Sequence, residues 1–182
     1  MMSQLAADLV SAAVRGGADA AEAIDAEHQA LSVSVRRGAL EEVEREEARD
    51  LSLRVFVGRR HATVSGSDIS AEGRARLVER AVAMARMAPE DPWAGLVDPD
   101  GQARDPHPAL DLFDPADPDP EALEGLAREA EAAALDMPRI ANSEGGSASS
   151  SRSVWRLATS NGLFGEQRAT GFHVGDSVVE GE

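Results

Sequence analysis

Histidines come first among the residues that could do chemistry, because two or three of them at short spacing can hold a catalytic zinc ion. The chain has four, and they are His28, His61, His107 and His173. They lie far apart in the sequence, and no His-Glu-x-x-His pattern occurs. The spacing predicts no zinc site, and we interpret these residues as exposed or incidental histidines.

A run of carboxylates offers a second kind of chemistry, since Ca²⁺ prefers oxygen ligands. Its members are Asp111, Asp114, Asp117, Asp119 and Glu121. An EF-hand loop needs ligands at alternate positions, a central glycine and a bidentate terminal glutamate, and this run lacks them. The pattern is more typical of a solvated loop that proline stiffens.

A serine-rich run suggests a nucleophile, and it consists of Ser147, Ser149, Ser150, Ser151 and Ser153. A nucleophilic serine needs a neighbouring base, and no Gly-x-Ser-x-Gly pattern or predicted base accompanies the run. We interpret it as a polar strand edge or turn. Gly145-Gly146, after Glu144, matches no phosphate-binding loop, and we interpret it as a tight turn. The sequence therefore predicts no catalytic, cofactor-binding or metal-binding residue in this chain.

The charge balance opposes direct binding to nucleic acid. The chain has 33 acidic and 18 basic residues, all of the latter arginine, and its net charge is −15. Such a surface repels phosphate backbones, whose binding depends on Lys and Arg. The only basic doublets, Arg36-Arg37 and Arg59-Arg60, are interpreted as solvated charges at strand ends.

Cysteine usage and hydropathy indicate the compartment. The chain has no cysteine, which excludes disulfides within it and suits a reducing compartment. Its first residues lack the basic flank and continuous apolar stretch of a secretion signal. No apolar run approaches the ~20 residues that a membrane helix needs. We expect a soluble cytoplasmic protein.

The first half of the chain has the pattern of an α+β domain. A helix capped by Ser3 is predicted to end at Gly16-Gly17. Alternating apolar residues then predict antiparallel strands with one wet face. Their ranges are 31–36, a charged strand 40–47, 51–57 and 60–65, with turns at Gly38, Asp50 and Gly58. A second helix, starting at Asp68 or Ser70 and stopped by Pro89, is expected to cover this meander.

A proline-rich segment, residues 89–120, carries eight of the nine prolines and is predicted to be extended. Apolar residues favour its being pinned along the surface rather than disordered. These anchors are Trp93, Leu96, Leu110, Leu112 and Phe113. Asp119 then caps a third helix opened by Pro120, and Pro138 follows its end.

The last part of the chain returns to β structure at Ile140. Asn161-Gly162 between two alternating runs predicts a hairpin with a type I′ turn, in which both residues adopt positive φ. The second strand runs through Val178-Val179 and stops at Glu182 without a closing element. We expect that the polypeptide has been cut before a further, β-rich C-terminal domain.

Several segments, in this order, resemble the N-terminal region of the TldD/TldE family. They are Gly17-Ala18-Asp19-Ala20-Ala21-Glu22, residues 53–58, residues 82–86, residues 89–96, Leu110-Asp111-Leu112-Phe113-Asp114-Pro115, Asn142-Ser143-Glu144-Gly145-Gly146-Ser147 and Thr159-Ser160-Asn161-Gly162. The Asp-Pro-Trp-Ala-Gly and Asn-Ser-Glu-Gly-Gly steps are similar to the TldE (PmbA) branch, once named modulator of DNA gyrase. No single motif decides the match; the order and spacing of all of them do.

The resemblance implies a cytoplasmic metallopeptidase system in which TldD-type and TldE-type subunits pair. It implies that zinc is bound by a His-Glu-x-x-x-His motif in the C-terminal half of the TldD-type subunit, and that flexible or unfolded peptides are the substrates. None of the metal ligands can be carried over, because no position of this sequence matches them.

We therefore expect residues 1–182 to be an N-terminal α+β domain that acts as a scaffold. It is expected to help in dimerisation and to form part of the wall of a substrate chamber, while a partner subunit catalyses the cleavage. An exposed sheet edge could accept an extended peptide through main-chain hydrogen bonds. The partner is expected to be a TldD-like subunit or a second copy. The alternative hypothesis is an acidic protein-interaction module without proteolytic context.

Overall fold

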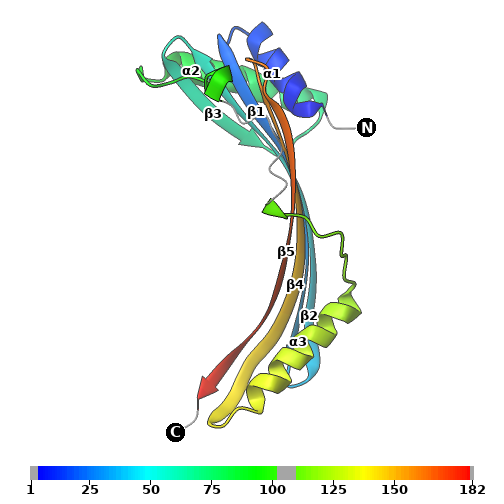
Figure 1. Ribbon diagram of the computed structural model, residues 1–182. Helices are drawn as coiled ribbons and strands as arrows, with labels where there is room; N and C mark the ends of the chain where they lie inside the picture. Colours follow the sequence, from blue (N-terminus) through cyan, green and yellow to red (C-terminus); the bar gives the residue numbers. More distant parts are fainter. Residues whose placement is uncertain (1–3, 102–109, 181–182) are drawn as a thin grey trace. The chain divides into compact units, whose positions relative to one another are not determined.

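The computed structural model describes residues 4–101 and 110–180. Its elements are α1 (Leu5–Arg15), β1 (Ala20–Arg36), β2 (Ala39–Val57), β3 (Arg60–Gly66), α2 (Ala71–Met87), a short 3₁₀ turn η1 (Pro99–Gly101), α3 (Pro120–Leu135), β4 (Ile140–Thr159) and β5 (Phe164–Glu180) (Figure 1). The strands form one antiparallel sheet in the order β3-β2-β1-β4-β5. The expected α+β class with an antiparallel sheet and covering helices is confirmed.

The chain divides into two compact units. The first takes its described residues from 1–27, 48–110 and 154–167, and the second takes them from 28–47, 111–153 and 168–182. The strands β1, β2, β4 and β5 each contribute residues to both units.

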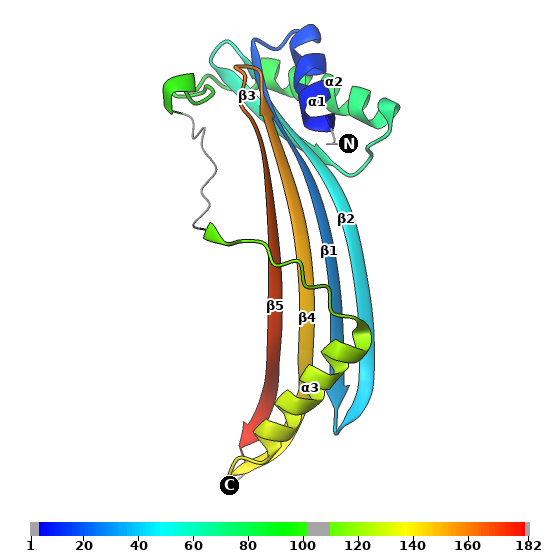
Figure 2. The same cartoon turned by 45° about the vertical axis from the view of Figure 1, so that its right-hand side comes forward.

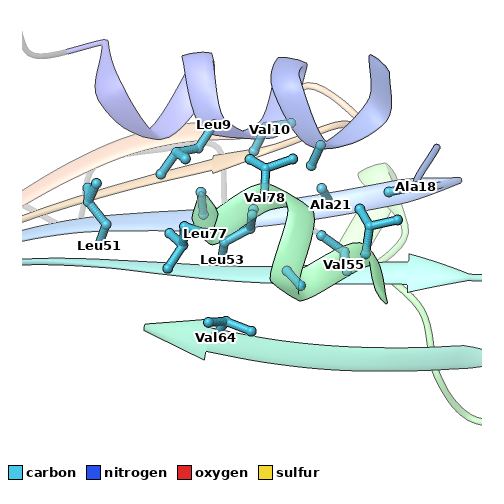
Figure 3. Close-up of a cluster of buried hydrophobic side chains, with 14 of the residues drawn as sticks. Leu9, Val10, Ala18, Ala21, Leu51, Leu53, Val55, Val64, Leu77 and Val78 are labelled. Carbon is cyan, nitrogen blue, oxygen red and sulfur yellow. The ribbon is translucent and has the colours of Figure 1, made fainter. Parts of the chain in front are cut away.

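The first unit is built from α1, α2 and the adjoining strands. Its core side chains are small aliphatic groups, as expected for a chain with few aromatic residues. Leu9 of α1, Leu77 of α2 and Leu53 of β2 are central members of it (Figure 3). The predicted cap of α2 is confirmed, because the Ser70 hydroxyl accepts a hydrogen bond from the Gly73 amide at 3.0 Å. The proposed cap of α1, Ser3, lies outside the described residues.

The strands are longer than the sequence predicted. β2 runs unbroken from Ala39 to Val57, so the predicted turn at Asp50 is wrong. β1 begins at Ala20, well before the predicted start at residue 31. Its first half was missed because Ala and acidic residues have low strand propensity, although burial there alternates as in any half-buried strand.

The turn between β1 and β2 is confirmed at Gly38. Arg37 and Gly38 form the two-residue loop, and both have positive φ, 53° and 71°. That combination is the type I′ turn, whose twist suits a hairpin. The charged stretch that follows is a strand, as predicted, and not a helix.

The second unit is built from α3 and the strands beneath it, which α3 crosses obliquely (Figure 2). The Asp119 cap is confirmed, because its carboxylate accepts a hydrogen bond from the Ala122 amide at 2.8 Å. The core joins two residues of α3 to four of β1 and β4. Its members are Leu31, Val33, Val35, Leu123, Ala127 and Ala148.

Gly145-Gly146 lies inside β4, so the predicted tight turn is wrong. Ser143 and Gly146 are both buried although they are three positions apart, and Gly145 has a φ of +129°. The change in alternation marks a β-bulge. At Gly146, a Cβ atom would overlap the Ala127 carbonyl oxygen of α3, so the absence of a side chain lets helix and strand approach closely.

The proline-rich segment is held by hydrogen bonds more than by apolar anchors. Trp93 is 91% exposed and Leu110 58%, so neither is an anchor. The Asp91 amide instead donates to the Arg59 carbonyl at 2.8 Å, and the Asn161 side chain donates to the Val97 carbonyl, also at 2.8 Å. The bond between Asp91 and Arg59 joins main-chain atoms, which all residue types share, and the sequence therefore did not reveal it.

The hairpin between β4 and β5 is confirmed at Asn161-Gly162, but its turn type is not. Gly162 has a φ of +98°, whereas Asn161 is not among the residues with positive φ. The connection spans four residues, 160–163, and the Thr159 amide donates to the Leu163 carbonyl at 2.9 Å across it. The loop is therefore wider than a type I′ turn. In residues 4–101 and 110–180, no helix is both long and apolar enough to span a membrane.

Candidate functional site

The histidines do not gather into a metal site. His61, on β3 of the first unit, lies beside the Phe56 ring at 6.0 Å between centroids. His28 and His173 are exposed on β1 and β5 of the second unit. His107 lies outside the described residues. Across the part of the chain that the structure describes, no three His, Asp or Glu side chains are placed to hold a metal ion.

Two carboxylates of the acidic run accept hydrogen bonds from nearby backbone amides. Asp119 caps α3, and the Asp114 carboxylate accepts a hydrogen bond from the Ala116 amide at 2.8 Å, which forms a local turn. Asp117 and Glu121 lie near them without joining a cluster that could bind a metal within the described residues. Asp111, Asp114 and Asp117 lie in a loop, as expected, whereas Glu121 belongs to the first turn of α3.

The serine-rich run lies within β4, between β1 and β5 in the sheet. It is therefore part of an interior strand and not of a sheet edge or a turn. The Ser151 hydroxyl donates to the Gly171 carbonyl of β5 at 3.5 Å. Ser143, outside the run, is buried and donates to the Asp176 carboxylate at 2.7 Å. These contacts tie β4 to β5.

An ionic cluster that the sequence did not predict lies in the first unit. Asp25 of β1 is fully buried, and Arg49 of β2 donates to both of its carboxylate oxygens, at 2.9 and 2.8 Å. Arg156 of β4 donates to Glu27 at 2.8 Å and to Glu166 of β5 at 2.9 Å. Four neighbouring strands thus share one network.

Hydrogen bonds in this cluster stabilise the charged form of both arginines. The hydrogen bond to Asp25 raises the pKa of Arg49 above its usual value. Burial alone would lower the pKa of Arg156, but the bonds to Glu27 and Glu166 raise it overall. The guanidinium groups occupy the carboxylate oxygens that a metal ion would need, so the cluster does not fit a metal.

A second buried carboxylate, Glu131 of α3, lies in the second unit and is 2% exposed. Its two oxygens accept hydrogen bonds from the Arg37 and Gly38 amides, both at 2.7 Å. The Gly38 amide bond is the main reason why the pKa of Glu131 lies below its usual value. Arg128, one turn earlier, donates to the Gly38 carbonyl. Both residues dock α3 onto the β1–β2 turn.

The surface best suited to a ligand is the outer edge of β5, which is an edge strand of the sheet. The Thr170 amide donates to the Leu112 carbonyl at 2.9 Å, and the Asp114 amide donates to the Thr170 hydroxyl at 2.8 Å. The segment 111–119, which we call the strap, runs on across the strands toward α3 (Figure 2). The strand edge therefore already forms one main-chain hydrogen bond with another segment of the chain, at Leu112.

Beyond the strap, the edge offers further backbone groups. Successive residues of an antiparallel strand direct their backbone groups alternately to the two sides. Because the Thr170 amide faces outward, the amides of Phe172, Val174 and Val178 face outward as well. Their side chains are 50%, 47% and 41% exposed. We call residues 170–180 with these groups the β5 edge. It can bind an extended segment by main-chain hydrogen bonds.

Two family descriptions match this chain, one in its first half and one in its second half. The description "PmbA/TldA metallopeptidase domain 1" matches residues 26–85, and "PmbA/TldA metallopeptidase central domain" matches residues 113–180. These spans together cover more than two thirds of the chain. The chain belongs to the TldD/TldE (PmbA) metallopeptidase family. The resemblance found in the sequence is thereby confirmed.

Relatives within the TldD/TldE family are similar along nearly the whole chain. Metalloprotease PmbA of Escherichia coli O157:H7 is 36% identical over 168 residues, which are 92% of this chain and 37% of the relative. The PmbA homolog of Haemophilus influenzae is 34% identical over 173 residues, or 94% of this chain and 38% of the relative. This chain therefore spans well under half of the length of these relatives.

Solved structures show the same fold. A protein named as a modulator of DNA gyrase from Bacteroides thetaiotaomicron superposes with a TM-score of 0.85 at 22% identity, over 96% of this chain and 41% of that one. TldE from Thermococcus kodakarensis superposes with a TM-score of 0.79 at 17% identity, over 98% of this chain and 40% of that one. The family is one of metallopeptidases, yet the described residues of this chain include no set that fits a metal.

Proposed function

We propose that residues 1–182 form the N-terminal scaffold of a TldE (PmbA)-like subunit. It pairs with a TldD-like subunit, helps to form the chamber in which flexible peptides are cut, and carries no catalytic residue itself. Zinc is held by the partner, and the assembly works in the cytoplasm. Support comes from the family, from PmbA relatives above 30% identity, and from described carboxylates that arginines or backbone amides already occupy.

The observation that carries the proposal is the β5 edge. A peptide that adds to it as a strand is recognised through its backbone, so its side chains are free to vary. Broad acceptance of flexible peptides follows. The bond between the Thr170 amide and the Leu112 carbonyl supports the proposal, because an added peptide would use the same kind of main-chain pairing.

A proline on the β5 edge tests this proposal. Val174→Pro removes one outward amide, and an edge strand tolerates proline where the lost N–H faces away from its partner. We expect the variant to bind a fluorescein-labelled flexible peptide about tenfold more weakly, since one main-chain hydrogen bond and its neighbours are lost. Val174→Ala keeps the amide and is the matched control. Equal binding by the proline variant would contradict the role of this edge.

The pairing is tested separately by co-expression with a TldD-like protein. The proposal predicts a 1:1 complex of discrete mass that cuts flexible peptides. Two separate peaks in gel filtration would instead favour the alternative, an acidic interaction module without proteolytic context.

A further inference from the structure

The first unit contains a groove of about 660 Å³ between α1 and α2. Its floor is apolar and is formed by Leu9, Val78 and Val82, which are nearly buried. Leu9 and Val78 lie between the two helices (Figure 3). The walls include Ala75 and Ala83, whose small side chains leave room for another element to approach.

The lining follows one stripe on each helix. On α2 it recurs at spacings of three and four residues from Ala71 to Arg86, and on α1 from Asp8 to Arg15. At 1.5 Å per residue, the stripe on α2 is about 22 Å long, which matches a helix of about 15 residues. A groove with an apolar floor beside a helix stripe of this length can bind the apolar face of an amphipathic helix.

Charge gives the groove its specificity. Three arginines, Arg15, Arg74 and Arg86, line it, together with the acidic residues Asp8 and Glu79. None of the three guanidinium groups forms an ion pair with any described residue, although the chain carries 33 acidic residues. Many other arginines of this chain are paired with carboxylates.

Two of these arginines belong to the same end of the groove. A Cβ atom placed on Gly17, just after α1, would lie 2.6 Å from the Arg86 Nη2 atom. Arg15 is in the last turn of α1, two residues before that point. This end therefore carries two unpaired positive charges, while the net charge of the whole chain is −15.

We infer that the groove between α1 and α2 docks an acidic amphipathic helix of a partner protein. The apolar side of that helix packs against Ala75 and Ala83 above the apolar floor, and its carboxylates pair with Arg15 and Arg86. The exposed alanines of the walls, Ala75 and Ala83, favour a helix over a free anion, since a small anion would leave their apolar surface uncovered. This surface is separate from the β5 edge and does not depend on the proposed function.

The test uses the full chain and a labelled synthetic helix of 15 residues, with leucines at i, i+4, i+7 and i+11 and glutamates in the first turn and along the flanks. Fluorescence anisotropy is expected to show saturable binding, and amide shifts in NMR are expected at residues 8–16 and 71–86. Reversing both charges, Arg15→Glu with Arg86→Glu, should weaken binding at least about tenfold. The matched control, Arg36→Glu with Arg59→Glu, should change it less than about twofold.

A steric variant gives an independent check. Ala75→Trp fills the groove from an exposed position, so it should abolish binding, whereas Ala132→Trp, also exposed but on α3, should leave it unchanged. The inference is overturned if a peptide with the same leucines and with lysines in place of the glutamates binds equally well, or if Ala75→Trp binds normally. It is also overturned if light scattering shows that a second copy of this chain occupies the groove.

Discussion

Replacing Glu131 by glutamine tests how α3 is fixed to the second unit. The glutamate is buried, and each of its oxygens accepts one hydrogen bond, from the Arg37 or the Gly38 amide at 2.7 Å. Glutamine keeps one acceptor but turns an NH₂ group toward a backbone donor. One charge-assisted bond is lost and one buried amide is left unpaired, so Glu131→Gln should lower the free energy of unfolding by about 2–4 kcal/mol.

The effect depends on pH in a direction that the structure fixes. The folded pKa of Glu131 is lowered from its reference value of 4.5. A carboxylate with a depressed pKa contributes stability that is fully present above the unfolded value and is lost as the pH falls through the folded value. The difference between wild type and Glu131→Gln should therefore be constant above about pH 5.5 and shrink below pH 4.5.

Urea unfolding at several pH values measures this difference, and hydrogen exchange at the Arg37 and Gly38 amides reports the local bond. Glu129→Gln is the matched control, because Glu129 is exposed on the same helix and should change the free energy of unfolding by less than about 0.5 kcal/mol. Unchanged exchange at both amides, together with a loss below about 0.5 kcal/mol for Glu131→Gln, would mean that Glu131 does not hold α3 to the β1–β2 turn.

Three further substitutions probe other parts of the structure, each measured by urea unfolding. Asp25→Ala leaves two guanidinium groups without their buried partner and should lower the free energy of unfolding by about 3–5 kcal/mol. The control Asp50→Ala, at an exposed position, should lower it by less than about 0.5 kcal/mol, and equal effects would contradict a network role for Asp25. Gly146→Ala should lower the free energy of unfolding by about 1–3 kcal/mol, because the added methyl group overlaps α3. The control Gly165→Ala places its methyl group in open space and should have a smaller effect. No effect of Gly146→Ala would mean that α3 lies farther from β4. Trp93→Ala should change stability by less than about 0.5 kcal/mol, since the side chain is 91% exposed, and a larger loss would restore Trp93 as an anchor.

Local signals in the sequence predicted the elements that local chemistry determines. Ser70, Asp119 and Pro120 mark helix starts through caps and backbone geometry that involve only the next few residues. Gly38 and Gly162 mark turns because both adopt positive φ. The order of elements and the α+β class followed from these signals and from the alternation of apolar residues.

Features that depend on distant partners could not be predicted in this way. Glu131 shares the buried stripe of α3 with Leu123 and Ala127, but no nearby residue indicates that backbone amides about 94 positions earlier donate hydrogen bonds to its carboxylate. Asp25 follows Ala21 and Ala23 at the buried positions of β1, and that alternation was the available signal. It was weak because alanine and aspartate are both uncommon in strands.

The backbone pairings of the strap and of the proline-rich segment were hidden for a related reason. The bonds from Thr170 to Leu112 and from Asp91 to Arg59 join main-chain atoms, which all residue types share. The candidate peptide-binding edge therefore became visible only when the order of the strands was known.

The proposed division of labour between two subunits is tested by measuring zinc content and peptide cleavage for the purified chain alone, for a TldD-like subunit alone and for their mixture. We expect that the chain alone retains no stoichiometric zinc and cuts no flexible peptide, and that its mixture with the TldD-like subunit forms an active 1:1 complex. Cleavage by the chain alone that requires Zn²⁺ and stops with a chelator would contradict this division of labour.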